Sequence, residues 1–190
     1  MANLLLKHLQ PGQRLPFLPL KRMTMAGEEL VIPDSDRGTH IMFRRFAGCP
    51  ICNVALRAYL QRIDQLRTAK VHSVVVFHSS ESETKRFQSQ LPISVIADEH
   101  RELYRLFGVG TSIRSVADPR TWWVAIKEIL RSGLRMPTEQ QNPFVLPADF
   151  LIDTDGCLTA AHYAQHAADV WDADQVLRLQ RDALGHQQRD

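Results

Sequence analysis

Hydrophobic positions follow two periods along the chain, and their alternation predicts an α/β protein. Continuous apolar, β-branched runs predict buried strands at 41–43, 71–78 and 93–96. The segment between the first two runs has the spacing of a helix with one buried face, carried by Leu56, Tyr59, Leu60 and Ile63. A strand, a helix and a second strand in this order form a βαβ unit, so we expect a sheet flanked by helices.

The chain before the first of these strands has a different pattern. Two β-prone runs, 17–23 and 30–32, flank the turn Ala26-Gly27-Glu28, which predicts a β-hairpin within an N-terminal extension spanning residues 1–38. Further along, acidic N-caps predict short helices at 81–87 and at 98–107.

The last strands are expected to be antiparallel. Pro147 precedes an apolar strand at 150–153, and Asp155-Gly156 is a hairpin turn into a strand at 157–163. A final helix from residue 172 to 184 has a buried face made by Val176, Leu177 and Leu184. A proline before such a strand can adopt a cis peptide bond, and the simpler alternative is a trans proline that opens an edge strand.

Residues 109–146 interrupt this order of strands and helices. Asp118-Pro119 opens a helical segment that carries Trp122 and Trp123 and ends at Gly133, followed by a loop. We interpret this stretch as a helical insertion whose tryptophans pack in the core or in a dimer contact. A lid or substrate surface is the functional alternative.

Composition is that of one soluble globular domain spanning residues 1–190, with 44% hydrophobic and 23% charged residues. The net charge of +2 arises from dispersed charges, which gives no case for binding nucleic acid or an anionic membrane. No apolar run is long enough to span a bilayer, and no signal-peptide pattern is present. With only 3 cysteines, the expected location is the cytoplasm.

Two of these cysteines form the motif Cys49-Pro50-Ile51-Cys52 directly after the first buried strand. Proline is favoured at the first position of a helix, so Cys49 is expected at the helix N-terminus with Cys52 one turn further. Residues three apart on a helix lie on the same side, so the two thiols can form a disulfide. This geometry is typical of a redox pair.

The helix also predicts different roles for the two sulfurs. Cys52 continues the apolar face that includes Leu56 and is expected to point inward. Cys49 meets the free N–H groups of the helix terminus and lies near Arg44 and Arg45, which should lower the pKa of its thiol. Cys49 is therefore the expected nucleophile and Cys52 the resolving thiol.

Three other interpretations of the motif remain. The cysteines can be small packed residues, as we expect for Cys157 in the last strand. Together with His162 and His166 they have the ligand types of a zinc site. They can also form a structural disulfide, although so short a loop restrains little chain entropy.

The order of elements resembles the thioredoxin fold in its peroxiredoxin-like form. Residues 43–52 resemble the arginine-x-x-x-C-P-x-C turn of the peroxiredoxin-like branch of the alkyl hydroperoxide reductase/thiol-specific antioxidant (AhpC/TSA) family, with Arg45 at the arginine position. Residues 95–109 resemble that family's aspartate and Tyr…Phe-Gly-Val segment. Residues 147–156 resemble the proline-initiated strand shared by thioredoxin-like proteins.

This resemblance implies an enzyme, a thiol peroxidase or thiol-disulfide oxidoreductase that reduces hydroperoxides and is recycled by a thioredoxin- or glutathione-type reductant. Its site residues would be Cys49, Cys52, Arg45 and Pro147, with no cofactor and no metal, and a homodimer is compatible with it. The positions where typical peroxiredoxins carry a peroxide-orienting threonine and a strand-borne arginine hold Phe46 and 147–149 instead. Exchange with protein disulfides, or a non-enzymatic role as a redox sensor, therefore remains an alternative.

Overall fold

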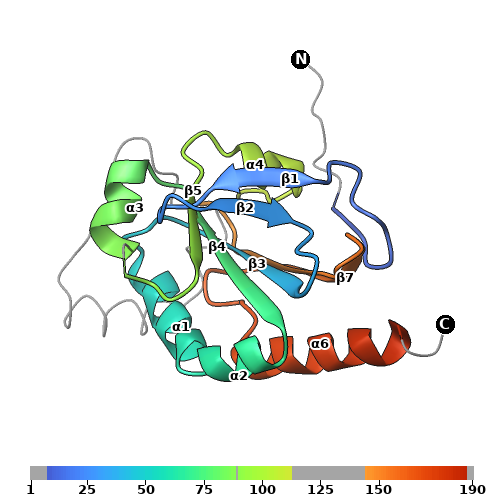
Figure 1. Ribbon diagram of the computed structural model, residues 1–190. Coiled ribbons are helices and arrows are strands. Elements are labelled where there is room, and N and C mark those ends of the chain that lie inside the picture. Colours follow the sequence, from blue (N-terminus) through green and yellow to red (C-terminus); the bar gives the residue numbers. More distant parts are fainter. Residues whose placement is uncertain (1–7, 89, 113–143, 188–190) are drawn as a thin grey trace, which may run out of the picture.

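A computed structural model describes residues 8–88, 90–112 and 144–187 (Figure 1). The predicted helix around Trp122 and Trp123 lies outside these residues. In chain order the elements are β1 (Leu20–Met23), β2 (Glu29–Ile32), β3 (Gly38–Arg44), α1 (Pro50–Leu60), α2 (Ile63–Thr68), β4 (Val71–Phe77), α3 (Glu81–Gln88), β5 (Ser94–Ala97), α4 (Glu102–Leu106), β6 (Ala148–Ile152), β7 (Leu158–Tyr163) and α6 (Ala173–Gln187).

The centre of the molecule is a five-stranded mixed sheet with the order β5-β4-β3-β6-β7. Strand β3 pairs in parallel with β4, from Gly38 opposite Val71 to Arg44 opposite Phe77. On its other side β3 pairs antiparallel with β6, and β6 pairs antiparallel with β7. The hairpin of β1 and β2 forms a separate two-stranded sheet. The predicted thioredoxin-like α/β fold with an N-terminal hairpin is thereby confirmed.

Alternating side chains of β3 enter two different cores, because successive residues of a strand point to opposite faces. Ile41 and Phe43 pack in the core beneath the hairpin and α4. Met42 points to the opposite face and packs in a second core with Leu56 of α1 and Val176 of α6. Figure 1 shows this division, with α1, α2 and α6 on one side of the sheet and the hairpin with α4 on the other.

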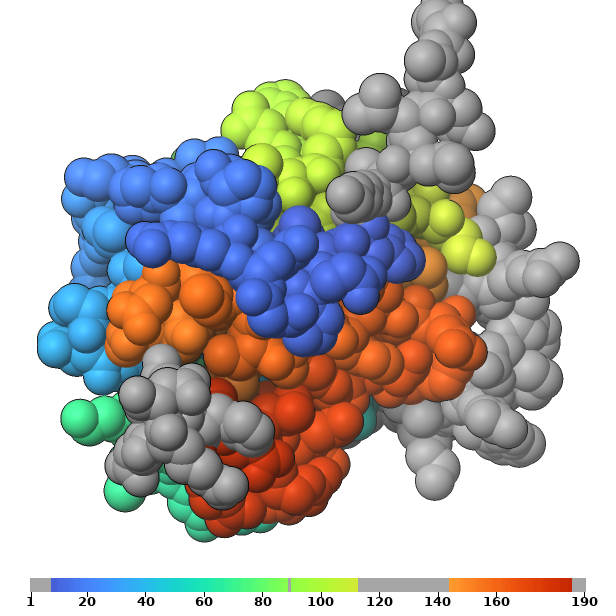
Figure 2. Space-filling model, turned by 90° about the vertical axis from the view of Figure 1, so that its right-hand side faces the viewer, coloured from blue at the N-terminus to red at the C-terminus, as the bar shows by residue number. Residues whose placement is uncertain are grey.

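The N-terminal segment reaches both outer strands of the sheet. The Gly12 N–H donates to the Leu158 carbonyl at 2.8 Å, and the Leu158 N–H donates to the Gln13 carbonyl at 2.9 Å. At the opposite edge of the sheet, the Met25 N–H donates to the Val95 carbonyl of β5 at 2.8 Å. Figure 2 shows the N-terminal stretch in blue lying across the C-terminal strands in orange.

Several local predictions need correction. The helix after the cysteines is divided at Gln61 and Arg62 into α1 and α2. Leu184, which was expected to be buried, is 42% exposed because it lies near the end of α6. The cis peptide bonds precede Pro19 and Pro33, so the bond before Pro147 is trans. The strand that follows Pro147 is not an edge strand, since β6 lies between β3 and β7.

The start of α4 matches its sequence signal. The Asp98 carboxylate accepts hydrogen bonds from the N–H groups of the first turn, at 2.9 Å from Glu102 and at 2.8 Å from Leu103. Gly108, with φ of +68°, follows the helix in the left-handed conformation that glycine adopts without strain. Among the described residues, no helix is both long and apolar enough to cross a membrane.

Candidate active site

The turn between β3 and α1 brings the two cysteines of the motif into contact. Both are free thiols, and their Sγ atoms lie 2.7 Å apart. Cys49 is the N-cap of α1, and its Sγ accepts the N–H of Cys52 at 3.4 Å. Pro50 occupies the first helical turn, where its missing N–H has no cost. The strand-turn-helix geometry predicted for the motif is therefore present.

Both thiols are buried. Cys49 is 0% exposed and Cys52 is 2% exposed. They form a small apolar cluster with Phe46, Ile51 and Ala167, of which Ala167 comes from the loop between β7 and α6. Burial of Cys52 agrees with its position on the inward face of α1. The sequence placed Cys49 at the helix tip without predicting its burial, to which the Ala167 loop contributes by packing in the same cluster.

Arg45 supplies positive charge at the thiols. Its side chain is nearly buried, and Nη2 donates to Cys49 Sγ at 3.3 Å. Burial acts to lower the pKa of the guanidinium, but the charges of Cys49 and Cys52 raise it above its ordinary value. The cation thus stays protonated in contact with the pair, as a stabiliser of a thiolate requires.

The two thiols ionise as a pair. Burial acts to raise the pKa of Cys52, but the hydrogen bond with Cys49 and the charge of Arg45 lower it to about 6. Burial raises the pKa of Cys49 well above its ordinary value, and the hydrogen bond and charge of Cys52 add to this. One thiolate therefore forms below neutral pH and the second proton is retained. The sequence predicted a lowered pKa at Cys49; the low pKa belongs to the coupled pair, in which Cys49 Sγ accepts from the Cys52 N–H and from Arg45 Nη2.

The backbone of the turn is held by polar side chains that the sequence analysis missed. The Ala47 N–H donates to Ser79 Oγ at 3.0 Å, and its carbonyl accepts Nε2 of Gln88 at 2.6 Å. Gln88 also donates to Oδ1 of Asn53 in α1 at 2.7 Å. Ser79 could have been found, because it follows the carboxyl end of β4 and neighbouring parallel strands end at the same edge of a sheet. Gln88 gives no such signal.

A buried charged cluster lies on the helix-covered face of β3, and the sequence analysis missed it as well. Arg44 Nη2 donates to Asp149 Oδ1 at 2.8 Å, and Nη1 donates to Oδ2 at 3.1 Å. His40 Nε2 lies 3.1 Å from the same Oδ1. Burial acts to raise the pKa of Asp149, but the Arg44 charge and the His40 hydrogen bond lower it to about 2. The available signal was the two polar residues His40 and Arg44, which flank an apolar run in a buried strand.

Pro147 contacts the start of the loop that reaches the cysteines. It is buried, and its carbonyl accepts the N–H of Ala164 at 3.1 Å. Ala164 begins the loop that carries Ala167. Pro147 thus anchors the loop that packs against the thiols, and a direct role in the chemistry stays a prediction.

The zinc interpretation finds no support in the described part of the chain. His162 Nε2 pairs with Oδ1 of Asp169 at 2.8 Å. No group of three or more histidine, cysteine or acidic side chains among residues 8–88, 90–112 and 144–187 is arranged to hold a metal ion.

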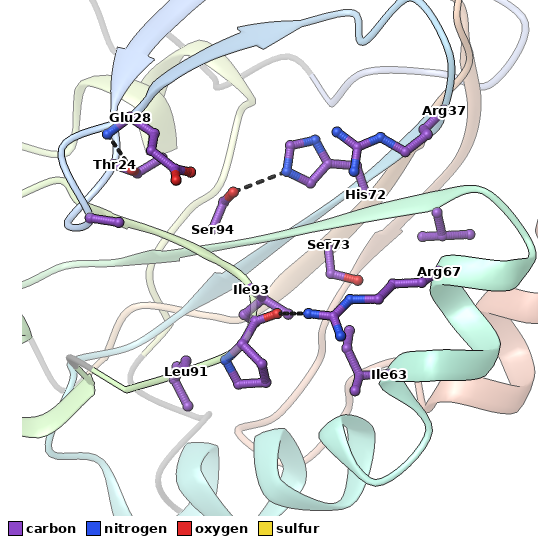
Figure 3. Close-up of a pocket in the computed structure, with 13 residues that line it drawn as sticks. Thr24, Glu28, Arg37, Ile63, Arg67, His72, Ser73, Leu91, Ile93 and Ser94 are labelled. Carbon is purple, nitrogen blue, oxygen red and sulfur yellow. Dashed lines mark hydrogen bonds between the residues drawn. The ribbon is translucent and has the colours of Figure 1, made fainter.

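A separate cavity of about 350 Å³ lies between α2, the first residues of β4 and the loop before β5 (Figure 3). Since Val71 pairs with Gly38 at the start of β3, the cavity is at the end of the sheet opposite to the cysteines. Its cations already have partners: Arg67 donates to the Pro92 carbonyl at 2.7 Å, and Arg37 pairs with Asp34 at 2.6 Å. We therefore assign no ligand to it.

Solved structures with the same fold are redox proteins. A cysteine-to-serine mutant of peroxiredoxin 6 from Arenicola marina has a TM-score of 0.68 and 16% identity, covering 93% of this chain and 74% of the other. Peroxidoxin BcpB from Mycobacterium tuberculosis has a TM-score of 0.66 and 16% identity, covering 92% and 98%. A putative thiol:disulfide interchange protein DsbE from Chlorobium tepidum has a TM-score of 0.58 and 18% identity, covering 92% and 97%. Identities this low establish the fold alone.

The family model for the AhpC/TSA antioxidant enzyme matches residues 55–166, more than half of the chain. No curated protein sequence matches. The matched region contains two of the three segments that carried the resemblance, 95–109 and 147–156, and it begins just after Cys52. The family expected from the sequence is thus confirmed. The chain belongs to the AhpC/TSA antioxidant enzyme family and has a thioredoxin-like fold.

Proposed function

We propose that the Cys49–Cys52 pair reduces hydroperoxides and is recycled by an external thiol reductant. The observation that carries this proposal is the contact of two buried thiols with each other and with Arg45. The pair loses its first proton near pH 6, so one reactive thiolate is present at neutral pH. The family's description as an antioxidant enzyme supports the same chemistry.

In the proposed reaction, Cys49 attacks and Cys52 resolves. The Sγ atoms are 2.7 Å apart, so the proton of Cys49 can pass to Cys52 and leave the negative charge on Cys49. There the Cys52 N–H and Arg45 Nη2 already donate to the sulfur. Their geometry stabilises a thiolate at the helix N-terminus.

The electron balance is that of two thiols and one peroxide. The Cys49 thiolate attacks one oxygen, the O–O bond breaks, and the leaving oxygen takes a proton to become an alcohol or water. The resulting sulfenic acid at Cys49 is attacked by the sulfur of Cys52, which releases water and forms the disulfide. Two electrons from a thioredoxin- or glutathione-type reductant then restore both thiols.

Burial favours a small substrate over a protein disulfide. Cys49 is 0% exposed, so a folded partner cannot place a disulfide against its sulfur without moving the cluster around it. A hydroperoxide needs to bring only one oxygen to the same atom. Exchange with a protein disulfide is the second candidate, favoured by the C-x-x-C pair and by Phe46 at the place of the peroxide-orienting threonine.

Stopped-flow kinetics with hydrogen peroxide, an organic hydroperoxide and a protein disulfide separate these candidates. We expect turnover of a hydroperoxide with thioredoxin or glutathione as reductant. Cys49→Ser should abolish the reaction, Cys52→Ser should accumulate a sulfenic acid, and Cys157→Ser should behave as the wild type. Faster reaction with the protein disulfide would favour the second candidate, and absence of turnover with all three substrates would overturn both. A reactive Cys49→Ser with an inert Cys52→Ser would reverse the two roles.

The cellular setting is also a proposal. A cycling C-x-x-C pair suits the cytoplasm, where thiol reductants keep cysteines reduced. Cell fractionation tests this location. Analytical ultracentrifugation of the reduced and oxidised protein tests the homodimer that the family resemblance suggested.

A further inference from the structure

The Asp149 carboxylate is enclosed by donors in the protein interior. Besides its two bonds with Arg44 and its contact with His40, Asp149 Oδ2 accepts the Trp171 N–H at 3.3 Å. Asp149 and His40 are 0% exposed and Arg44 is 2% exposed. Charged side chains are almost never buried this deeply unless they are paired, so the cluster holds an obligatory ion pair.

Arg44 is fixed next to the thiol turn. It directly precedes Arg45, and its side chain lies on the face of β3 that α1 covers, as those of His40 and Met42 do. Its Nη1 also donates to the Phe43 carbonyl at 3.1 Å, which adds a further contact that holds the guanidinium in place. The Arg44 charge acts on Cys52 and favours its thiolate.

We propose that Asp149 is a positioning residue for the thiol pair: by neutralising Arg44, it limits the positive charge that acts on Cys49 and Cys52. The proposal rests on the function proposed above, because it sets the pH at which the reactive thiolate forms. In a low-dielectric interior a charge is felt over longer distances than in water, so an unpaired Arg44 would act strongly on the nearby sulfurs.

The remaining titratable groups around this cluster do not alter the balance. His40 Nδ1 lies 2.9 Å from the Tyr59 hydroxyl, which in turn lies 2.8 Å from Ser73 Oγ. Burial lowers the pKa of His40 and raises that of Tyr59, so both are neutral near pH 7. Tyr104, whose hydroxyl donates to the Arg44 carbonyl, is neutral for the same reason. His162, which lies opposite Asp149 on β7, is paired with Asp169. Among the described residues, the charges that act on the thiols are thus those of Arg45 and Arg44, and Asp149 acts through its pairing with Arg44.

Two single variants with opposite expected effects test the proposal. Asp149→Asn leaves the Arg44 charge unbalanced, and we expect the thiolate to form at lower pH. Arg44→Gln leaves the carboxylate unbalanced, and we expect the thiolate to form at higher pH. Each shift should change the ratio of thiolate to thiol at a fixed pH by about threefold or more, which corresponds to about half a pKa unit. The double variant carries neither charge and should return close to the wild-type midpoint.

The readout is the pH dependence of iodoacetamide alkylation and of ultraviolet thiolate absorbance, neither of which requires peroxide turnover. A failure of the proposed peroxidase activity is thereby distinguishable from a failure of this inference. Tyr59→Phe is the matched control, because it disturbs the same cluster without changing its charge and should leave the midpoint unchanged. If Asp149→Asn does not fold, Arg44→Gln and the double variant decide. Shifts of equal sign in the two single variants, or an unchanged midpoint in Arg44→Gln, would overturn the proposal.

Discussion

Replacing Arg45 by methionine should remove most of the thiolate at neutral pH. Arg45 is 6% exposed and its Nη2 lies 3.3 Å from Cys49 Sγ, so its charge acts on the pair with little screening by water. Methionine has a similar length and preserves packing against the apolar cluster. The expected loss is therefore electrostatic.

The size of the effect follows from the pKa of the pair. With a pKa of about 6 at Cys52, roughly nine-tenths of the pairs carry a thiolate at pH 7. An ordinary cysteine, with a pKa of about 8.5, is only about 3% ionised at that pH. Loss of the cation should thus slow alkylation and peroxide reduction at pH 7 by about thirtyfold. The hydrogen bond between Cys49 and Cys52 remains in the variant and reduces this loss, whereas burial of the two thiols adds to it.

The assay is a pH profile of the alkylation rate and of hydroperoxide consumption between about pH 5 and pH 10, a range that spans both pKa values. The profile of Arg45→Met should move to higher pH and recover the wild-type alkylation rate at the alkaline end. Arg45→Lys keeps the charge, so its profile should shift less. Arg57→Met removes an exposed arginine of α1, and its profile should coincide with that of the wild type. A profile that coincides with the wild type would refute the electrostatic role of Arg45. A loss of peroxide reduction that alkaline pH does not restore would instead indicate that Arg45 acts on the peroxide itself.

Two stability predictions concern buried and capping carboxylates. The pKa of Asp149 falls from 3.8 to about 2 on folding, so its contribution of about 2 kcal/mol is present above pH 4 and is lost as the pH falls through 2. Urea unfolding measures the free energy of unfolding at pH 7 and at pH 3. Its decrease between the two pH values should be smaller in the Arg44→Gln/Asp149→Asn double variant than in the wild type, and an equal decrease would contradict this assignment. Asp98→Ala removes the acceptor of the first N–H groups of α4 and should lower the free energy of unfolding by about 1–2 kcal/mol in urea titrations. Asp98→Asn keeps a capping oxygen and should retain most of the free energy of unfolding that Asp98→Ala loses.

The sequence predicted those elements that local patterns determine. The β-branched run at 71–78 and the hairpin turn at Asp155-Gly156 each specify a strand or turn through neighbouring residues, and β4, β6 and β7 lie where these patterns placed them. The division of the helix at Gln61 and Arg62 had no such signal, because both residues are compatible with a continuous helix.

The site was predicted less completely, because its environment is assembled from distant parts of the chain. The C-P-x-C motif indicated the contact of the two thiols, but the burial of Cys49 depends on Ala167, more than a hundred residues away. In the same way, the sequence contains both Arg44 and Asp149 without any indication that they pair, since the pairing arises from the antiparallel register of β3 and β6. The coupled ionisation of the two thiols was not predicted for the same reason: the helix terminus was visible in the sequence, and the burial of both sulfurs was not.

The contacts of the N-terminal segment with β5 and β7 have a consequence for the behaviour of the protein at high concentration. An outermost strand presents unpaired N–H and C=O groups, on which another molecule can add a strand. Residues 12 and 13 pair with Leu158 at one margin of the sheet, and Met25 pairs with Val95 at the other. The segment thus blocks intermolecular strand addition along part of both margins. A chain shortened to begin at Gly38 would lose this protection together with the hairpin residues that cover one core of the sheet, and both losses favour aggregation.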